Sequence, residues 1–252
     1  MHDKSNVDIL LAHNLFLFLY GVKSTHAHAM KPTSNLWKND QGFIWMLVIS
    51  ILILITSQLA VGILWESKFF VRFGFFLFTV LAVKSSALSG KGKSIGYAIA
   101  TSMLVLAMAM IRLENQWLVL AYSAITNSYL IYIIALVVNQ IFAGGTITVN
   151  KIGGGVAVYI LLGHLWASLY LTMYIIHPAS FLYGGELIQN NEAVKHLSYF
   201  SFVTLTTIGY GDIVAVSSTA RILAILEGLL GQLVPAIFIA KLVSLQLEHA
   251  KK

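Results

Sequence analysis

The chain has no cysteine among its 252 residues and few charged residues, and both scarcities restrict its possible chemistry. Without cysteine it can form no disulfide, no thiolate metal site and no cysteine nucleophile. Charged residues make up only 10% of the sequence, whereas 58% is hydrophobic and the mean hydropathy is +0.81. Because soluble domains carry about 25% charged residues, the composition predicts an integral membrane protein.

The sequence also lacks the short motifs that mark common catalytic and nucleic-acid-binding sites. It contains no HExxH, no GxSxG, no P-loop and no pair of carboxylates on one helix. His26 and His28 form an isolated HxH, which offers too few ligands for a metal site. We therefore predict no enzyme activity, no cofactor, no nucleic-acid partner and no small-molecule substrate.

Six apolar runs are candidates to cross a bilayer, which takes about 20 residues of helix. The strongest, residues 43–65, has no charge and a tryptophan near each end, where such rings favour the membrane interface. The weakest, residues 68–88, holds Arg72 and Lys84 near its ends. The other runs are residues 94–111, 116–142, 154–176 and 218–246. We expect an all-α transmembrane fold with six spans.

The lysines and arginines predict how these spans are oriented. If the N-terminus is cytoplasmic, eleven of the 16 basic residues lie on the inner side and five on the outer side. The positive-inside rule then favours a multi-pass protein of the cell (inner) membrane with both termini in the cytoplasm. Residues 1–40 are expected to be a cytoplasmic, partly interfacial segment. A cleaved signal over residues 1–29 is the alternative, although it would invert every loop against the charge bias.

A strip of small residues lies between the fifth and sixth runs, within TLTTIGYGDI at residues 204–213. Residues 191–206 have helical character but are too short to cross a membrane, so we expect a re-entrant helix. Irregular backbone at membrane depth must line a cavity or be buried in protein. Gly209 and Gly211 accept dihedral angles that let successive carbonyls face one side, and such a row can replace an ion's hydration shell.

The sequence TTIGYGD resembles the selectivity filter of tetrameric potassium channels, and residues 198–221 resemble the pore-helix and filter block of the bacterial members. The resemblance implies that the permeant K⁺ is the one metal ion bound. It also implies a homotetramer around one axis, in contact with itself and with the lipid bilayer. We call residues 207–211 the TIGYG strip. By resemblance, K⁺ is bound there by the carbonyls of Thr207, Ile208, Gly209 and Tyr210 and the Thr207 hydroxyl, with Gly211 at the outer mouth.

The same resemblance implies supporting roles for residues next to the strip. Tyr199 and Phe200 fall where the family keeps an aromatic cuff, although two core aromatics are an equal alternative. Tyr199 would hold Asp212 through its hydroxyl, and Thr206 would complete the support. Residues 207–211 would then be braced from behind.

The last apolar run resembles the family's inner, cavity-lining helix. Gly231 matches the gating-hinge glycine by its distance from the strip, and Pro235 follows one turn later. Helix packing is the alternative role for these residues. Glu227 is expensive inside a membrane, so we expect it either to line the cavity and attract K⁺ or to pair with His164.

The fourth run decides whether voltage can act on the chain. Residues 116–142 contain no Arg or Lys, and the membrane potential exerts no force on an uncharged segment. We therefore expect no steep voltage gating. The expected domains are an N-terminal segment (1–40), a four-helix membrane domain in the position of a sensor but without gating charges (41–143), an inner linker (144–153) and a pore domain (154–252) with outer helix 154–176, pore helix 191–206, filter 207–211 and inner helix 218–247.

The sequence thus predicts a potassium-selective channel through which K⁺ passes passively. Two alternatives stay open. The chain could be a pore-forming or regulatory subunit of a potassium transport system, or a cation channel with relaxed K⁺/Na⁺ selectivity.

Overall fold

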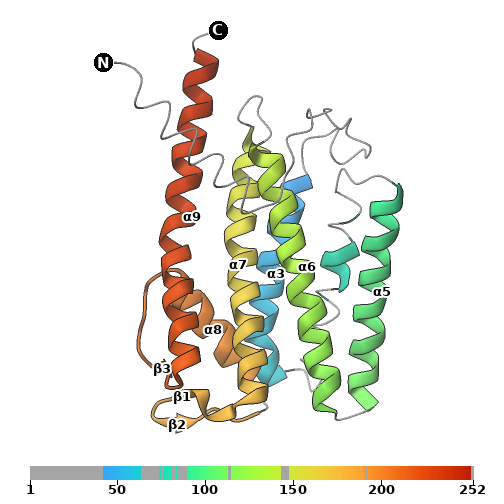
Figure 1. Ribbon diagram of the computed structural model, residues 1–252, viewed down its shortest axis with the longest axis vertical. Helices are drawn as coiled ribbons and strands as arrows, with labels where there is room; N and C mark the ends of the chain where they lie inside the picture. Colours follow the sequence, from blue (N-terminus) through green and yellow to red (C-terminus); the bar gives the residue numbers. More distant parts are fainter. Residues whose placement is uncertain are drawn as a thin grey trace. The chain divides into compact units, whose positions relative to one another are not determined.

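Helices make up most of the described chain (Figure 1). The computed structural model describes residues 42–63, 74, 76–80, 83, 90–112, 115–142, 148–190 and 192–250. The predicted N-terminal segment and most of the predicted span 68–88 lie outside these ranges. The helices are α3 (Gly42–Ile63), α5 (Gly90–Arg112), α6 (Gln116–Phe142), α7 (Val149–Ile176), the 3-10 helix η1 (Pro178–Ser180), α8 (Ala193–Leu205) and α9 (Ser218–Ala250).

Three helices of the described ranges are long and apolar enough to cross a membrane. They are α6, α7 and the part of α9 over Ser218–Ser244, which correspond to the fourth, fifth and sixth predicted runs. The apolar stretches of α3 and α5 over described side chains, Gly42–Gln58 and Ser94–Ala109, are shorter. Three candidate spans are therefore present, and the arrangement of six stays a prediction.

Helix α7 is the centre of the packing. It contacts α3, α6, α8 and α9, while α5 packs on α6 (Figure 1). It begins at Val149, earlier than the predicted 154, because the Thr148 side chain caps it by accepting the Lys151 N–H at 3.3 Å. A Cβ added at Gly154 would lie 3.0 Å from the Phe43 ring. Gly153, which was expected in the linker, therefore belongs to α7, and the neighbouring Gly154 allows close packing.

Asn150 ties the start of α3 to α7. Its buried Oδ1 accepts the backbone N–H groups of Phe43 and Ile44 at 3.0 and 3.3 Å. The first N–H groups of any helix lack partners within the helix, so Asn150 acts as a cap supplied by another helix. This cap connects residues more than 100 positions apart in the sequence.

We expect Asn150→Ala to lower the stability of the folded chain by about 1 to 3 kcal/mol, because one buried and one partly buried N–H group lose their acceptor. The midpoint of thermal unfolding in detergent measures this loss. Asn150→Asp is the matched control, since it keeps an acceptor oxygen at the same place. An equal midpoint for Asn150→Ala and the wild type would contradict the capping role.

A small antiparallel sheet corrects the all-α prediction. Its order is β2-β1-β3, with strands β1 (Phe181–Tyr183), β2 (Glu186–Leu187) and β3 (Ile213–Ala215). Strands β1 and β2 are joined by Gly184 and Gly185, whose φ angles of +58° and +89° suit a tight hairpin turn. In the register, Leu182 pairs with Val214, so the segment before α8 binds the segment that follows the strip.

Candidate functional site

The TIGYG strip follows the C-terminal end of α8 and has an unusual backbone. The φ angle is positive at every second residue: +59° at Thr207, +58° at Gly209 and +80° at Gly211. The N–H groups of Ile208 and Gly209 both donate to the carbonyl of Val203, at 3.0 and 3.3 Å. The strip therefore continues from the end of α8 with alternating φ angles, and its first N–H groups still bond to the helix.

The carbonyl groups of the strip have no hydrogen-bond donor in the described part of the chain. All five residues are exposed, and Tyr210 is 70% exposed. Nearly all buried backbone carbonyls in folded proteins are paired, whereas these exposed carbonyls are open to a partner from outside the chain. Water, a cation or another chain could supply it.

Two glycines let α8 approach its neighbours closely. A Cβ added at Gly163 on α7 would lie 2.5 Å from the Phe202 ring, and one added at Gly231 on α9 would collide with the carbonyl oxygen of Leu205. Real Cβ atoms do not come so near, so larger residues at these places would displace α8. The start of the strip is thus positioned from two sides.

The sheet and Tyr199 hold the exit of the strip. The backbone carbonyl of Asp212 accepts the Gly184 N–H at 2.9 Å, and the Asp212 side chain lies near enough to the Tyr199 hydroxyl to affect its pKa. Desolvation raises the pKa of Tyr199, and the hydrogen bond to Asp212 raises it further. Tyr199 therefore keeps its proton at neutral pH, and its role as a support of Asp212 stays a prediction.

The other two support residues occupy different surroundings. Phe200 is buried and packs against the rings of Tyr170 and Phe181, with centroids 5.1 and 5.6 Å away. Phe200 is therefore a core aromatic, which was the alternative to an aromatic cuff that the sequence left open. Thr206 is the C-cap of α8, and its hydroxyl donates to the Phe202 carbonyl at 2.6 Å.

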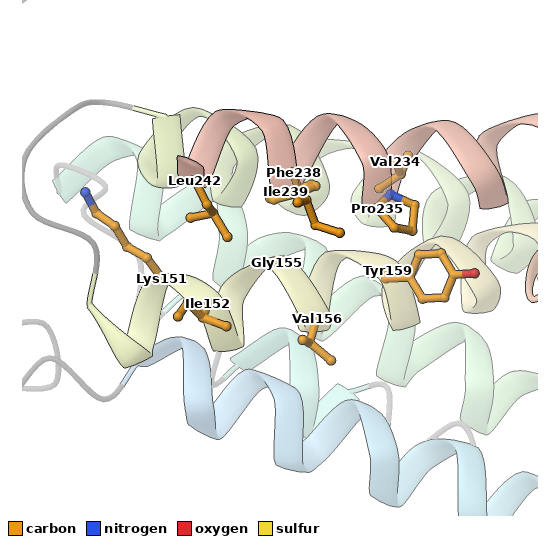
Figure 2. Close-up of a pocket in the computed structure, with 10 residues that line it drawn as sticks. All are labelled: Lys151, Ile152, Gly155, Val156, Tyr159, Val234, Pro235, Phe238, Ile239 and Leu242. Carbon is orange, nitrogen blue, oxygen red and sulfur yellow. The ribbon is translucent and has the colours of Figure 1, made fainter. Parts of the chain in front are cut away.

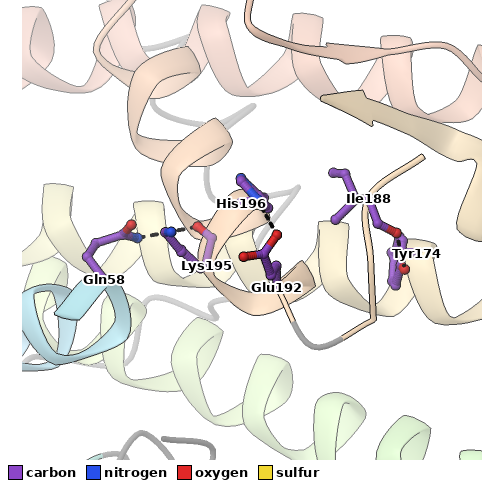
Figure 3. A network of polar contacts seen from close by, with 6 residues as sticks. All are labelled: Gln58, Tyr174, Ile188, Glu192, Lys195 and His196. Carbon is purple, nitrogen blue, oxygen red and sulfur yellow. Dashed lines mark hydrogen bonds and ion pairs between the residues drawn. The ribbon is translucent and has the colours of Figure 1, made fainter. Parts of the chain in front are cut away.

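Polar contacts also fix the beginning of α8 (Figure 3). The Tyr174 hydroxyl lies 2.7 Å from the carbonyl of Ile188 and 2.8 Å from the Asn190 side chain. On the other side, the Gln58 amide of α3 donates to the Lys195 carbonyl at 3.4 Å. Helix α8 is therefore held by α3 as well as by α7 and α9.

The structure does not bring Glu227 and His164 together. Glu227 is fully buried, with Tyr170 and Ser201 each 2.6 Å from its carboxyl oxygens. His164 is also buried, and its Nε2 lies 3.0 Å from the carbonyl of Ser50 on α3. The predicted pair is wrong because α3 and α8 supply nearer partners. Burial within one chain also argues against Glu227 lining an open cavity.

Helix α9 continues through Gly231 and Pro235. Proline has no N–H, so the carbonyl of Gly231 loses its usual helical donor. The Tyr159 hydroxyl of α7 lies 3.5 Å from that carbonyl and 2.9 Å from the Leu205 carbonyl. One side chain therefore reaches both the predicted hinge and the end of α8.

A cavity of about 280 Å³ separates α7 from α9 beyond this point. Figure 2 shows Tyr159 and Pro235 at one end of it and Lys151 and Leu242 at the other. The lining in between is apolar. The part of α9 after Pro235 therefore borders this space, while its Phe238 packs closely against Gly155 of α7.

The geometry agrees with a comparison to known families. Residues 147–247 match the family model described as "Ion channel". The matched segment includes α7, α8, the TIGYG strip and most of α9. No curated protein and no solved structure was found to match the chain. Together with the apolar helices, the match supports an ion-transporting membrane protein.

Four features of the matched segment were missed from the sequence: the β1–β2 hairpin and the contacts of Tyr159, Tyr170 and Ser201. The hairpin had a signal, since two adjacent glycines between strand-forming residues are typical of a two-residue turn. The roles of Tyr159, Tyr170 and Ser201 had none, because their partners lie at least 26 positions away along the chain.

Proposed function

We propose that the chain forms a potassium-selective channel through which K⁺ moves down its electrochemical gradient. The observation that carries this proposal is the TIGYG strip, whose positive φ angles alternate and whose carbonyls have no donor in the described chain. Aligned carbonyls can replace the hydration shell of K⁺. The C-terminal dipole of α8, which ends next to the strip, favours a cation there.

The proposal includes a homotetramer. One chain holds one strip, and a closed ring of carbonyls needs several. Two exposed surfaces support this assembly: the strip itself and the apolar face of α9 that neither α7 nor α8 covers. Large side chains on that face are 47% to 63% exposed in one chain: Ile222, Ile225, Leu226, Leu229, Leu233, Ile237 and Ile239.

The remaining features of the proposal concern control and placement. The channel is not steeply voltage-gated, because residues 116–142 form an uncharged helix. It lies in the cell membrane with both termini in the cytoplasm, as the distribution of basic residues favours. It needs no cofactor beyond the permeant ion.

Reconstitution of the purified full chain in liposomes tests the function. We expect K⁺-driven flux, and a reversal potential in mixed K⁺ and Na⁺ that follows the K⁺ gradient. Mass measurement in detergent should give four chains. A conducting protein whose reversal potential ignores the K⁺ gradient would show relaxed selectivity, a silent tetramer would favour a subunit of a larger transport system, and a monomer would overturn the tetrameric pore.

A further inference from the structure

A three-way contact behind the strip joins the outer, pore and inner helices. Glu227 of α9 lies 2.6 Å from the Ser201 hydroxyl of α8 through Oε1, and 2.6 Å from the Tyr170 hydroxyl of α7 through Oε2. Ser201 Oγ also lies 2.8 Å from the carbonyl oxygen of Gly163 on α7. Glu227 and Tyr170 are both fully buried, as is Ser201.

The number of hydrogens in this contact constrains the protonation of Glu227. The carbonyl of Gly163 can only accept, so the single hydrogen of the Ser201 hydroxyl points to it. A second hydrogen is then needed between Ser201 Oγ and Glu227 Oε1, and only a protonated carboxyl can supply it. With an ionised carboxylate, Ser201 would have one hydrogen for two acceptors.

The surroundings of Glu227 lead to the same conclusion. The side chain has no exposed surface, and no basic side chain of the described residues forms an ion pair with it. Burying an unpaired carboxylate is far more costly than burying a hydrogen-bonded neutral acid. The neutral form uses every polar atom of the group: it donates to Ser201 and accepts from Tyr170.

We propose that Glu227 is a neutral carboxylic acid that positions the pore helix. Its O–H donates to Ser201, Ser201 donates to the Gly163 carbonyl, and Tyr170 donates to the second carboxyl oxygen. This chain of donors fixes α8 against both α7 and α9, one turn before α8 ends at Leu205, just ahead of the strip. The conduction part of this inference rests on the proposed function, but the protonation part does not.

Infrared spectroscopy of the purified full chain tests the protonation. We expect the carbonyl stretch of a protonated carboxyl at neutral pH, and its loss in Glu227→Gln. Glu186→Gln is the control, because Glu186 is exposed on β2 and its removal should leave the band in place. A carboxylate band that disappears with Glu227→Gln, in place of the protonated one, would overturn the proposal whether or not the chain conducts.

Three substitutions at Glu227 test the positioning role. Gln keeps one donor and one acceptor at the same reach, so Glu227→Gln should conduct within about twofold of the wild type. Leu at this position fills the space without hydrogen bonds, and Asp is too short to reach Ser201 and Tyr170. Glu227→Leu and Glu227→Asp should therefore each conduct about tenfold less than the wild type, or still less. The melting temperatures of the same tetramers should follow the same order.

The comparison separates this role from the alternatives. An ionised carboxylate that accepts two hydrogen bonds would be poorly replaced by Gln, so a Glu227→Gln protein as impaired as Glu227→Leu would contradict the neutral acid. Unchanged melting and conduction in Glu227→Leu would contradict positioning altogether. If no variant and no wild-type protein conducts, the melting order and the infrared band still decide the inference, and the proposed function alone fails.

Discussion

Gly209→Ala is expected to abolish K⁺ conduction, with a loss of more than about 100-fold in flux. Gly209 has a φ of +58°, where an L-residue costs about 1 to 2 kcal/mol. A homotetramer carries the substitution four times around one axis, so the strain sums to about 4 to 8 kcal/mol at a single pore. No atom lies within 4 Å of the added Cβ in one chain, so backbone conformation and not crowding within the chain drives the effect.

Gly184→Ala is the matched control for this prediction. Gly184 also has a φ of +58° and also has nothing within 4 Å of an added Cβ, but it lies in the β1–β2 turn. It should suffer the same backbone strain and still conduct K⁺ selectively. The comparison is made by liposome flux and reversal potential on tetramers of verified mass. Equal flux from the two variants would show that the strip is not the conducting element.

The parts of the site that depend on nearby residues could be predicted from the sequence. The apolar runs predicted the helices α6, α7 and α9, because hydrophobic length is a local property. The short helix before the TIGYG strip was also expected, at 191–206, and the structure has it at Ala193–Leu205. Alternating glycines likewise indicated where φ would be positive, although Thr207 shares that conformation without being glycine.

The parts that depend on how helices pack against each other could not be predicted in this way. His164 was predicted as the partner of Glu227 because both lie at a similar depth in the membrane. Depth does not tell which side of its helix a residue lies on. The face of α7 that meets α9 carries Tyr170, while His164 faces α3 and contacts the Ser50 carbonyl. The buried contacts of Ser201 are likewise fixed by the tertiary arrangement, since a serine in an apolar helix carries no signal of its partner.

The roles of the glycines could not be predicted from the sequence either. A glycine pattern predicted a linker at 144–153 and a hinge at Gly231, since glycine is permissive in both settings. The structure places Gly153 within α7 and shows that another helix approaches Gly231 too closely for a side chain. Composition cannot separate flexibility from close approach, because both select the residue with no Cβ.

Gly231→Ala is therefore expected to disrupt the assembly of the pore domain and not merely to stiffen a hinge. The added Cβ would collide with the carbonyl oxygen of Leu205 and lie 2.9 Å from its carbonyl carbon. Because the obstacle is backbone, no side-chain rotation relieves it, and α8 must move away from α9. Overpacking of this kind costs about 1 to 3 kcal/mol in each chain, and the displaced end of α8 carries the strip. We expect a lower melting temperature of the tetramer together with a large loss of K⁺ flux.

Gly228→Ala is the control that shows whether any Gly-to-Ala change in α9 lowers melting temperature and K⁺ flux, or only the change at Gly231. Gly228 lies in the same helix, and an added Cβ meets nothing within 4 Å in one chain. It should melt and conduct like the wild type. A pure hinge makes the opposite prediction for Gly231→Ala: the tetramer would keep its melting temperature, and only the open probability in single-channel records would change. The pocket beside Pro235 lies on the C-terminal side of the contact that Gly231 makes with Leu205, so any bending of this helix should centre on Pro235.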